Sequence, residues 1–180
     1  MITSVSDRWI AQNGEVLYAR PGTSGITAED IAALKDMAKR SSRGRCRFCL
    51  HESASDLLHD MVIAFVPGAY DRPHKHHAKT ETLIAIEGDA FYLRFSDNGR
   101  PISAQLISAS EKSGALHVLR TPVGEYHALL ISGGSFVFCE STLGPFDPEA
   151  SEFAPWSPVP EDKSSVDHYL AELHSWATTP

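Results

Sequence analysis

The stretch Gly68–Gly88, GAYDRPHKHHAKTETLIAIEG, decides the fold assignment and is the starting point for the rest of the chain. It concentrates His74, His76 and His77 within four positions, although the whole chain of 180 residues has only nine histidines. Residues two apart on a strand share a face, with Cα atoms about 6.5 Å apart. His74 and His76 can therefore share one metal ion, whereas His77 points to the opposite face.

Two further side chains can complete a ligand set with this pair. Glu81 follows the short segment HAKT and opens an apolar strand, so its carboxylate can return to the same place. His127 follows the turn Pro122–Gly124 at the head of another apolar strand, and a barrel can bring it opposite the pair. The predicted metal ligands are His74, His76, Glu81 and His127. The alternative is a histidine-rich surface hairpin.

This ligand set limits the type of ion. Three nitrogen ligands with one carboxylate suit a single divalent transition metal, namely Fe, Mn, Ni, Zn or Cu. Four protein ligands also leave open coordination positions on an octahedral ion, where a substrate could bind. A small-molecule substrate or ligand is therefore the expected partner.

The segment from Arg45 to Thr142 is predicted to be mainly β. It consists of short apolar runs separated by turn sequences such as Asp97-Asn98-Gly99 and Gly133-Gly134, which is typical of an all-β sandwich or barrel. Residues 27–40 and 164–177 have the apolar periodicity of helices. The expected organisation is one structural domain with three parts: an N-terminal helical and strand extension (1–44), the β-barrel (45–143), and a proline-rich arm with a C-terminal helix (144–180).

The proline-rich arm has two interpretations. Its five prolines between residues 143 and 160 exclude a regular helix or a central strand. A flexible linker is one alternative. We favour an extended segment held on the barrel, because linkers are poor in aromatic residues and this arm contains Phe146, Phe153 and Trp156. All three are expected to be buried.

The spacing of the opening stretch resembles the first sequence motif of the cupin family. Each fixed position of that motif is matched, by Gly68, His74, His76, Glu81 and Gly88. The core of the second motif is matched by Pro122, Gly124 and His127. There are two departures: no glycine stands five residues before Pro122, and Ile131 occupies a position that usually holds Asn. The resemblance implies a single cupin double-stranded β-helix, or jelly-roll, barrel with a metal site.

A narrower resemblance extends from about Arg45 to Pro158. The segments LHES, PHKHHAKTETLIAIEG, YHALL, CESTLGPF and EFAPWSP are similar to those of the WbuC-type cupin-fold metalloproteins of bacteria. That family is named for members in O-antigen gene clusters, so the resemblance implies a role in polysaccharide biosynthesis.

Several other polar residues are candidates for the site. On a strand, Arg47 and His51 share a face and could bind an anionic substrate group, although a solvated face is favoured. Glu140 lies among apolar residues and could act as a catalytic acid or base, although exposure to solvent is slightly favoured. Arg94 is a candidate substrate-binding residue with the same two interpretations.

The Cys46-x-x-Cys49 pair could indicate zinc or redox chemistry. However, the two residues would point to opposite faces of a strand, so we favour incidental cysteines. The third cysteine, Cys139, leaves an odd number, which does not fit a disulfide framework.

Charge and composition disfavour nucleic acid and membrane as partners. A net charge of −7 and a pI of about 5.7 disfavour nucleic acid. No apolar run approaches the length of a membrane span, and the first residues lack a signal-peptide pattern. A cytoplasmic protein is expected, and barrel edge strands make a homodimer plausible.

Three functions remain open from the sequence. The first is a metal-dependent enzyme acting on a small polar metabolite, such as a carbohydrate in O-antigen or polysaccharide biosynthesis, with isomerase- or epimerase-like chemistry. The second is an Fe(II)-dependent dioxygenase. The third is a metal-bound sensor or ligand-binding module without enzymatic activity.

Overall fold

A computed structural model describes residues 7–179. Residues 1–6 of the predicted extension and residue 180 of the predicted C-terminal part lie outside the described residues. The two α-helices are α1 (Ala28–Arg40) and α2 (Lys163–Ala177), and a short 3-10 helix spans Pro148–Ala150. The strands are β1 (Trp9–Ala11), β2 (Val16–Ala19), β3 (Arg45–Cys49), β4 (Leu58–Phe65), β5 (His74–His76), β6 (Glu81–Glu87), β7 (Asp89–Phe95), β8 (Pro101–Ser108), β9 (Val118–Thr121), β10 (Tyr126–Ile131), β11 (Phe136–Leu143) and β12 (Ser151–Phe153).

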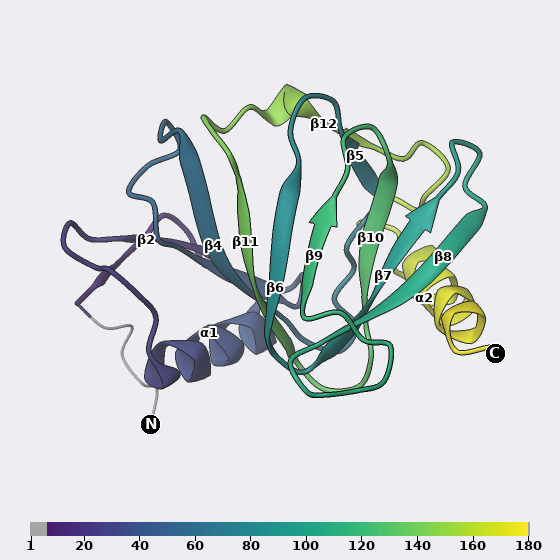
Figure 1. Ribbon diagram of the computed structural model, residues 1–180, viewed down its shortest axis with the longest axis horizontal. Helices are drawn as coiled ribbons and strands as arrows, with labels where there is room; N and C mark the ends of the chain where they lie inside the picture. Colours follow the sequence, from purple (N-terminus) through teal and green to yellow (C-terminus); the bar gives the residue numbers. More distant parts are fainter. Residues whose placement is uncertain (1–6, 180) are drawn as a thin grey trace.

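The strands form two facing sheets (Figure 1). One sheet has the order β1-β2-β3-β4-β11-β6-β9, and the other has the order β12-β5-β10-β7-β8. Of the eight strands from β4 to β11, four lie in each sheet, and successive strands alternate between the sheets except for the hairpin β7–β8. This is the arrangement of a jelly roll. The predicted double-stranded β-helix, flanked by one helix on each side in sequence, is therefore confirmed.

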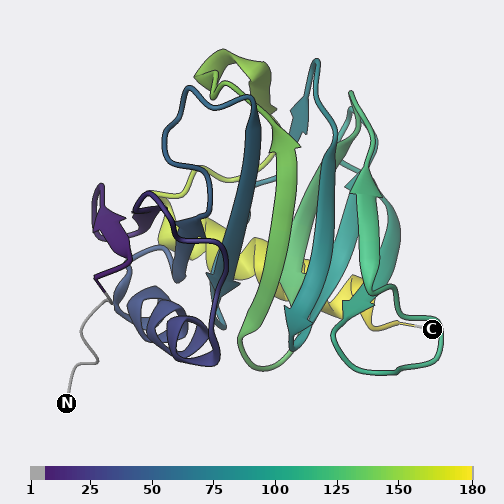
Figure 2. The same ribbon diagram turned by 60° about the vertical axis from the view of Figure 1, so that its left-hand side comes forward.

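The N-terminal elements extend the first sheet and cover its outer face. β2 pairs in parallel with β3, and α1 packs on β3 and β4. Thr27 caps α1: its hydroxyl accepts a hydrogen bond from the Asp30 amide, while the Asp30 carboxylate accepts one from the Thr27 amide. Figure 2 shows α1 on one side of the barrel, with α2 passing behind the strands.

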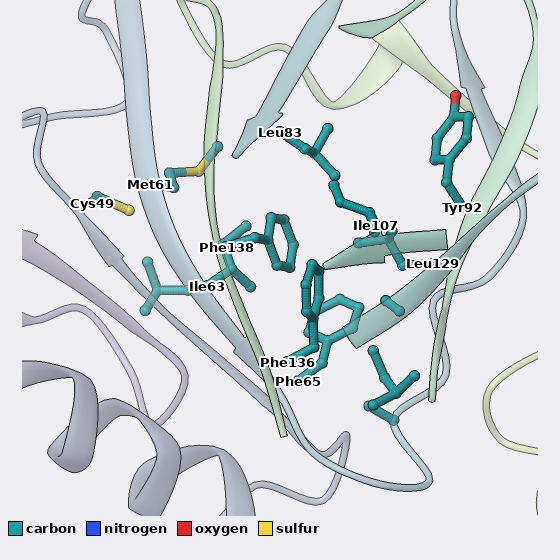
Figure 3. Packing of buried hydrophobic residues seen from close by; sticks show 14 residues of the cluster. Cys49, Met61, Ile63, Phe65, Leu83, Tyr92, Ile107, Leu129, Phe136 and Phe138 are labelled. Atoms are coloured by element: carbon teal, nitrogen blue, oxygen red, sulfur yellow. The ribbon is translucent and has the colours of Figure 1, made fainter. Parts of the chain in front are cut away.

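Aromatic side chains fill one end of the barrel interior. Phe65, Phe136 and Phe138 pack against one another there (Figure 3), with ring centroids 5.2 Å apart for Phe136 and Phe138. The strand turn beside them requires a glycine: Gly88 has a φ of +79°, and a Cβ on it would lie 2.2 Å from the Ser135 carbonyl oxygen. The opposite end of the interior stays open as a cavity.

The arm crosses that open end of the barrel (Figure 1). β12 pairs with β5 as an edge strand. The sequence did not predict this strand, which can form because the prolines of the arm lie outside it. Trp156 is partly buried against Phe95 and Tyr126, as expected, together with residues of α2. The expectation that Phe146 and Phe153 are buried is wrong: their exposures are 58% and 57%. Both line the cavity opening, where no second layer covers them.

Candidate functional site

Four predicted ligands from three strands converge inside the barrel. His74 and His76 are the two ends of β5, Glu81 begins β6, and His127 lies on β10 directly opposite His74. One ligand atom from each residue lies within 4.8 Å of all the others. His77 points away, with half of its side chain exposed, and it is not in this cluster.

Hydrogen bonds orient the three imidazole rings. Nδ1 of His74 lies 2.9 Å from the Arg72 carbonyl oxygen, and Nδ1 of His127 lies 2.9 Å from the Glu125 carbonyl oxygen. A carbonyl can only accept, so Nδ1 carries the proton in these rings and the neutral ring keeps its lone pair on Nε2. Outer hydrogen bonds of this kind are typical of metal-binding histidines.

The third ring depends on the arm. His76 Nδ1 lies 2.8 Å from the Ser151 hydroxyl at the start of β12. A hydroxyl can donate or accept, so it fixes the His76 tautomer less strictly than a carbonyl would. The arm therefore supplies one outer contact of the site.

The unpaired atoms of the cluster fit a metal ion. Nε2 of His76 and Nε2 of His127 are buried and have no hydrogen-bond partner in the part of the chain that the structure describes. His76 Nε2 lies 2.9 Å from Glu81 Oε1, without hydrogen-bond alignment, and His127 Nε2 lies 3.9 Å from Glu81 Oε2. Two atoms that each lie about 2.1 Å from one ion are about 3.0–4.2 Å apart. The residues therefore fit a shared ion after a contraction of a few tenths of an ångström.

The protonation states also suit metal binding. Burial by itself would raise the pKa of Glu81, but the contact with His76 and the charge of Lys79 lower that pKa to about 2. Burial, with the nearby His74, lowers the pKa of His127 to about 3. At neutral pH, Glu81 is therefore a carboxylate and His127 a neutral imidazole, the forms that bind metal.

The cluster opens into a cavity of about 860 Å³. A row of polar residues crosses its wall at the level of Glu81, because His59, Thr142, Glu81 and Thr121 are direct cross-strand neighbours on β4, β11, β6 and β9. All four are buried. The cavity therefore offers polar contacts near the cluster and apolar ones beneath it.

Glu140 faces this cavity and not bulk solvent. It lies opposite Leu83 on β6, two residues from Glu81. Burial, together with the negative charge of Glu81, raises the pKa of Glu140 to about 8. A carboxyl group with this pKa can exchange a proton near neutral pH. Glu140 therefore meets this requirement of the predicted role as a catalytic acid or base.

The predicted substrate-binding residues are divided between two places. Arg47 and His51 line the cavity, contrary to the favoured solvated face, because this face of β3 points into the barrel. Arg94 shares the inward face of β7 with Tyr92 but lies at the strand end, where its guanidinium pairs with Glu125. Arg94 is not among the cavity-lining residues.

The sequence reasoning missed several polar residues in the cavity. Within residues 7–179, the buried hydroxyl groups of Tyr92 and Thr121 and the buried Nε2 of His59 have no hydrogen-bond partner. Burial raises the pKa of Tyr92 to about 12, so its phenol stays protonated and can donate. Strand alternation with Glu81 and His127 could have found Thr121 and Tyr92 once the strand pairing was known.

Cys46 and Cys49 point to opposite sides of β3. Cys46 packs in the cluster beneath α1, and Cys49 packs in the barrel interior. Burial raises the pKa of these thiols to about 12 and about 11, so both are protonated at neutral pH. Among residues 7–179, only the histidine–glutamate cluster groups three or more metal-binding side chains closely enough to hold an ion.

Similarity to known proteins covers parts of the chain. A family model described as a domain of unknown function (DUF6016) matches residues 26–107, which include His74, His76 and Glu81 but not His127. No curated protein matches the chain in sequence. Within residues 7–179, no helix is long and apolar enough to span a membrane.

Two solved structures are similar in fold. Protein SO0799 from Shewanella oneidensis has a TM-score of 0.53 at 13% identity, over 71% of this chain and 87% of that chain. The capsular polysaccharide assembling protein CapF from Staphylococcus aureus has a TM-score of 0.51 at 23% identity, over 63% of this chain and 32% of CapF. The match thus spans about a third of the length of CapF. At these identities the likeness concerns the fold alone, which the strand order gives as a double-stranded β-helix.

Proposed function

We propose that this protein is a mononuclear metalloenzyme of the WbuC type that acts on a small polar metabolite. The observation that carries the proposal is the convergence of His74, His76, Glu81 and His127 in the wall of an open cavity. A bound divalent ion would act there as a Lewis acid on a substrate carbonyl or hydroxyl oxygen.

The surrounding residues have distinct roles in this proposal. Tyr92 and Thr121 present unpaired hydroxyl groups beside the cluster and can bind substrate oxygens. Glu140 can hold or release a proton near neutral pH. Phe146 and Phe153 at the cavity opening limit the access of water to the ligand.

A carbohydrate substrate is part of the proposal. CapF is a capsular polysaccharide assembling protein, and the WbuC-like segments favour the same area of metabolism. The polar row of the cavity wall, with two threonines and a histidine beside Glu81, suits a hydroxylated ligand.

Metal analysis of the full-length protein, purified without a histidine tag, tests the proposal. We expect one metal ion per chain in the wild type and in His77→Ala, and strongly reduced metal in His74→Ala and in His127→Ala. His77 is the matched control because it is the neighbouring histidine on the outer face. Equal metal content in all four proteins, or no metal in the wild type after loading, would refute the site.

Oxygen consumption then separates two kinds of enzyme. The Fe(II)-loaded protein is mixed with candidate hydroxylated substrates in an oxygen electrode. Substrate turnover without oxygen uptake supports the proposal. Uptake of oxygen in proportion to the substrate consumed would instead show that the protein is a dioxygenase.

A further inference from the structure

The cavity wall opposite the metal cluster carries two arginines without partners. Arg45 and Arg47 are two residues apart on β3, share its inward face and line the same cavity. Among the described residues 7–179, neither guanidinium forms an ion pair or a hydrogen bond, and Arg47 Nε is fully buried without a partner. Two unpaired cations held this close repel each other and lose hydration, which costs free energy.

Neighbouring acids do not neutralise this pair. Burial lowers the pKa of Arg45 and the charge of Asp71 raises it, but the Asp71 carboxylate accepts a hydrogen bond from the Leu129 amide and makes no ion pair within residues 7–179. Burial raises the pKa of Glu140 and the charge of Arg47 lowers it, but these two side chains form no ion pair there either. Glu15 pairs with Arg43 instead. The cavity therefore contains two guanidinium groups whose donors are available to a ligand.

A stacked histidine pair lines the same cavity, and His59 lies at the level of Glu81 in the metal cluster. The rings of His51 and His59 are 4.0 Å apart and nearly parallel. His51 Nδ1 faces the Asp60 carbonyl oxygen at 3.2 Å, so it carries the proton, and Nε2 remains an acceptor. His59 is 5% exposed, and its Nε2 is unpaired in the cavity. An acceptor nitrogen suits a ligand hydroxyl group, so we assign the anion to the arginines alone and a hydroxyl group to His51.

The strand register gives the order of these features along the cavity. His59 lies at the level of Glu81, two strand spacings or about 10 Å across the sheet. Arg47 lies one strand further and pairs with Ile63, four residues or about 13 Å along β4 from His59. The arginines therefore lie deeper in the barrel than the histidine pair, and a ligand that reaches both the metal and the arginines has to extend across and down the cavity.

We propose that Arg45 and Arg47 form an anion subsite that binds the carboxylate or phosphate of a hydroxylated substrate whose opposite end reaches the metal cluster. This inference deepens the proposed function and rests on it for the role of the metal. Guanidinium groups suit both oxyanions, because their planar donors match paired oxygens.

The test uses inorganic phosphate and acetate with the full-length chain after chelator treatment, so that no metal can bind the anion. The Arg47 Nε–Hε signal is followed by NMR during each titration. We expect saturable binding, weakened by about tenfold or more in Arg47→Gln. Arg94→Gln, which removes an arginine outside the cavity, should bind as the wild type does. Arg45→Gln provides the same test if Arg47→Gln does not fold.

The relative affinities for the two anions show which group the substrate carries. Tighter binding of phosphate indicates a phosphorylated substrate, and tighter binding of acetate indicates a substrate with a carboxylate. Unchanged affinity in Arg47→Gln, an equal loss in Arg94→Gln, or no binding by the wild type would overturn the subsite. Metal analysis of the same proteins, loaded with metal and not treated with chelator, separates the two proposals. A chain that binds phosphate through Arg47 but holds no metal would refute only the metal site.

Discussion

Replacing Ser151 with alanine tests whether the arm helps to build the metal site. Ser151 begins β12, and its hydroxyl lies 2.8 Å from His76 Nδ1. The corresponding partners of His74 and His127 are backbone carbonyls, which no substitution removes. Ser151 is therefore the position where a side-chain change can remove the outer contact of a predicted ligand without touching the ligand itself.

The expected effect is a loss of metal affinity without loss of the fold. When His76 binds a cation, its Nδ1–H becomes a stronger donor, and a hydrogen bond of this charge-assisted kind contributes about 1.5–3 kcal/mol. Since 1.4 kcal/mol corresponds to a factor of ten, Ser151→Ala should bind metal about 10- to 100-fold more weakly. The backbone pairing of β12 with β5 remains, so the melting temperature of the metal-free protein should change little.

A competition titration against a chromogenic zinc chelator measures this affinity. Ser165→Ala is the matched control, because it removes a serine hydroxyl at the start of α2, where the partner is Asp162. Wild-type affinity in Ser151→Ala would show that the arm does not support His76. An equal loss in Ser165→Ala would mean that general destabilisation causes the effect.

Three further predictions concern the ligand carboxylate, the arm and the buried acid. Glu81→Gln should still bind metal but shift selectivity from Fe(II) and Mn(II) toward Cu(II) or Zn(II), because it removes the charged oxygen ligand. Competitive loading with these metals is read by mass spectrometry, and an unchanged metal profile would exclude Glu81 as a ligand. Trp156→Ala should lower the free energy of unfolding by up to about 3–5 kcal/mol, whereas the exposed Phe146→Ala should have little effect; equal denaturation midpoints would contradict the packing. Glu140 has a pKa of about 8 in the folded state against 4.5 as its reference value, so the folded metal-free protein loses stability as the pH rises through this window. Glu140→Gln should remove that loss, and parallel stability–pH curves for the two proteins would disprove it.

The sequence was most informative where spacing is local. Strand alternation places His74 and His76 on one face of β5, and the short connection to β6 returns Glu81 to the same place although the two strands belong to different sheets. His127 could be added because its turn residues resemble a second motif. Ser151 could not be predicted, since it is 75 residues from His76 and meets it only because the arm crosses the open end of the barrel.

The aromatic residues of the arm show a second limit of sequence reasoning. Phe146, Phe153 and Trp156 carry the same apolar signal, which favours burial for all three. Only Trp156 reaches a site with neighbours on several sides, between Phe95 and Tyr126. Hydrophobicity indicates that a side chain avoids water in general, but the path of the arm determines whether a partner surface exists.

The arginines show why strand alternation cannot identify a binding site by itself. Arg47 and Arg94 both share a face with inward-pointing neighbours, so alternation treats them alike. They differ in depth: Arg47 lies in the middle of β3, beside the cavity, whereas Arg94 is next to the end of β7 and reaches Glu125 at the exposed rim. Alternation gives the face of a residue, and only the register of the neighbouring strands gives its level in the barrel. An ionic partner at the rim satisfies Arg94, and the absence of one deeper in the barrel leaves Arg47 available to a ligand.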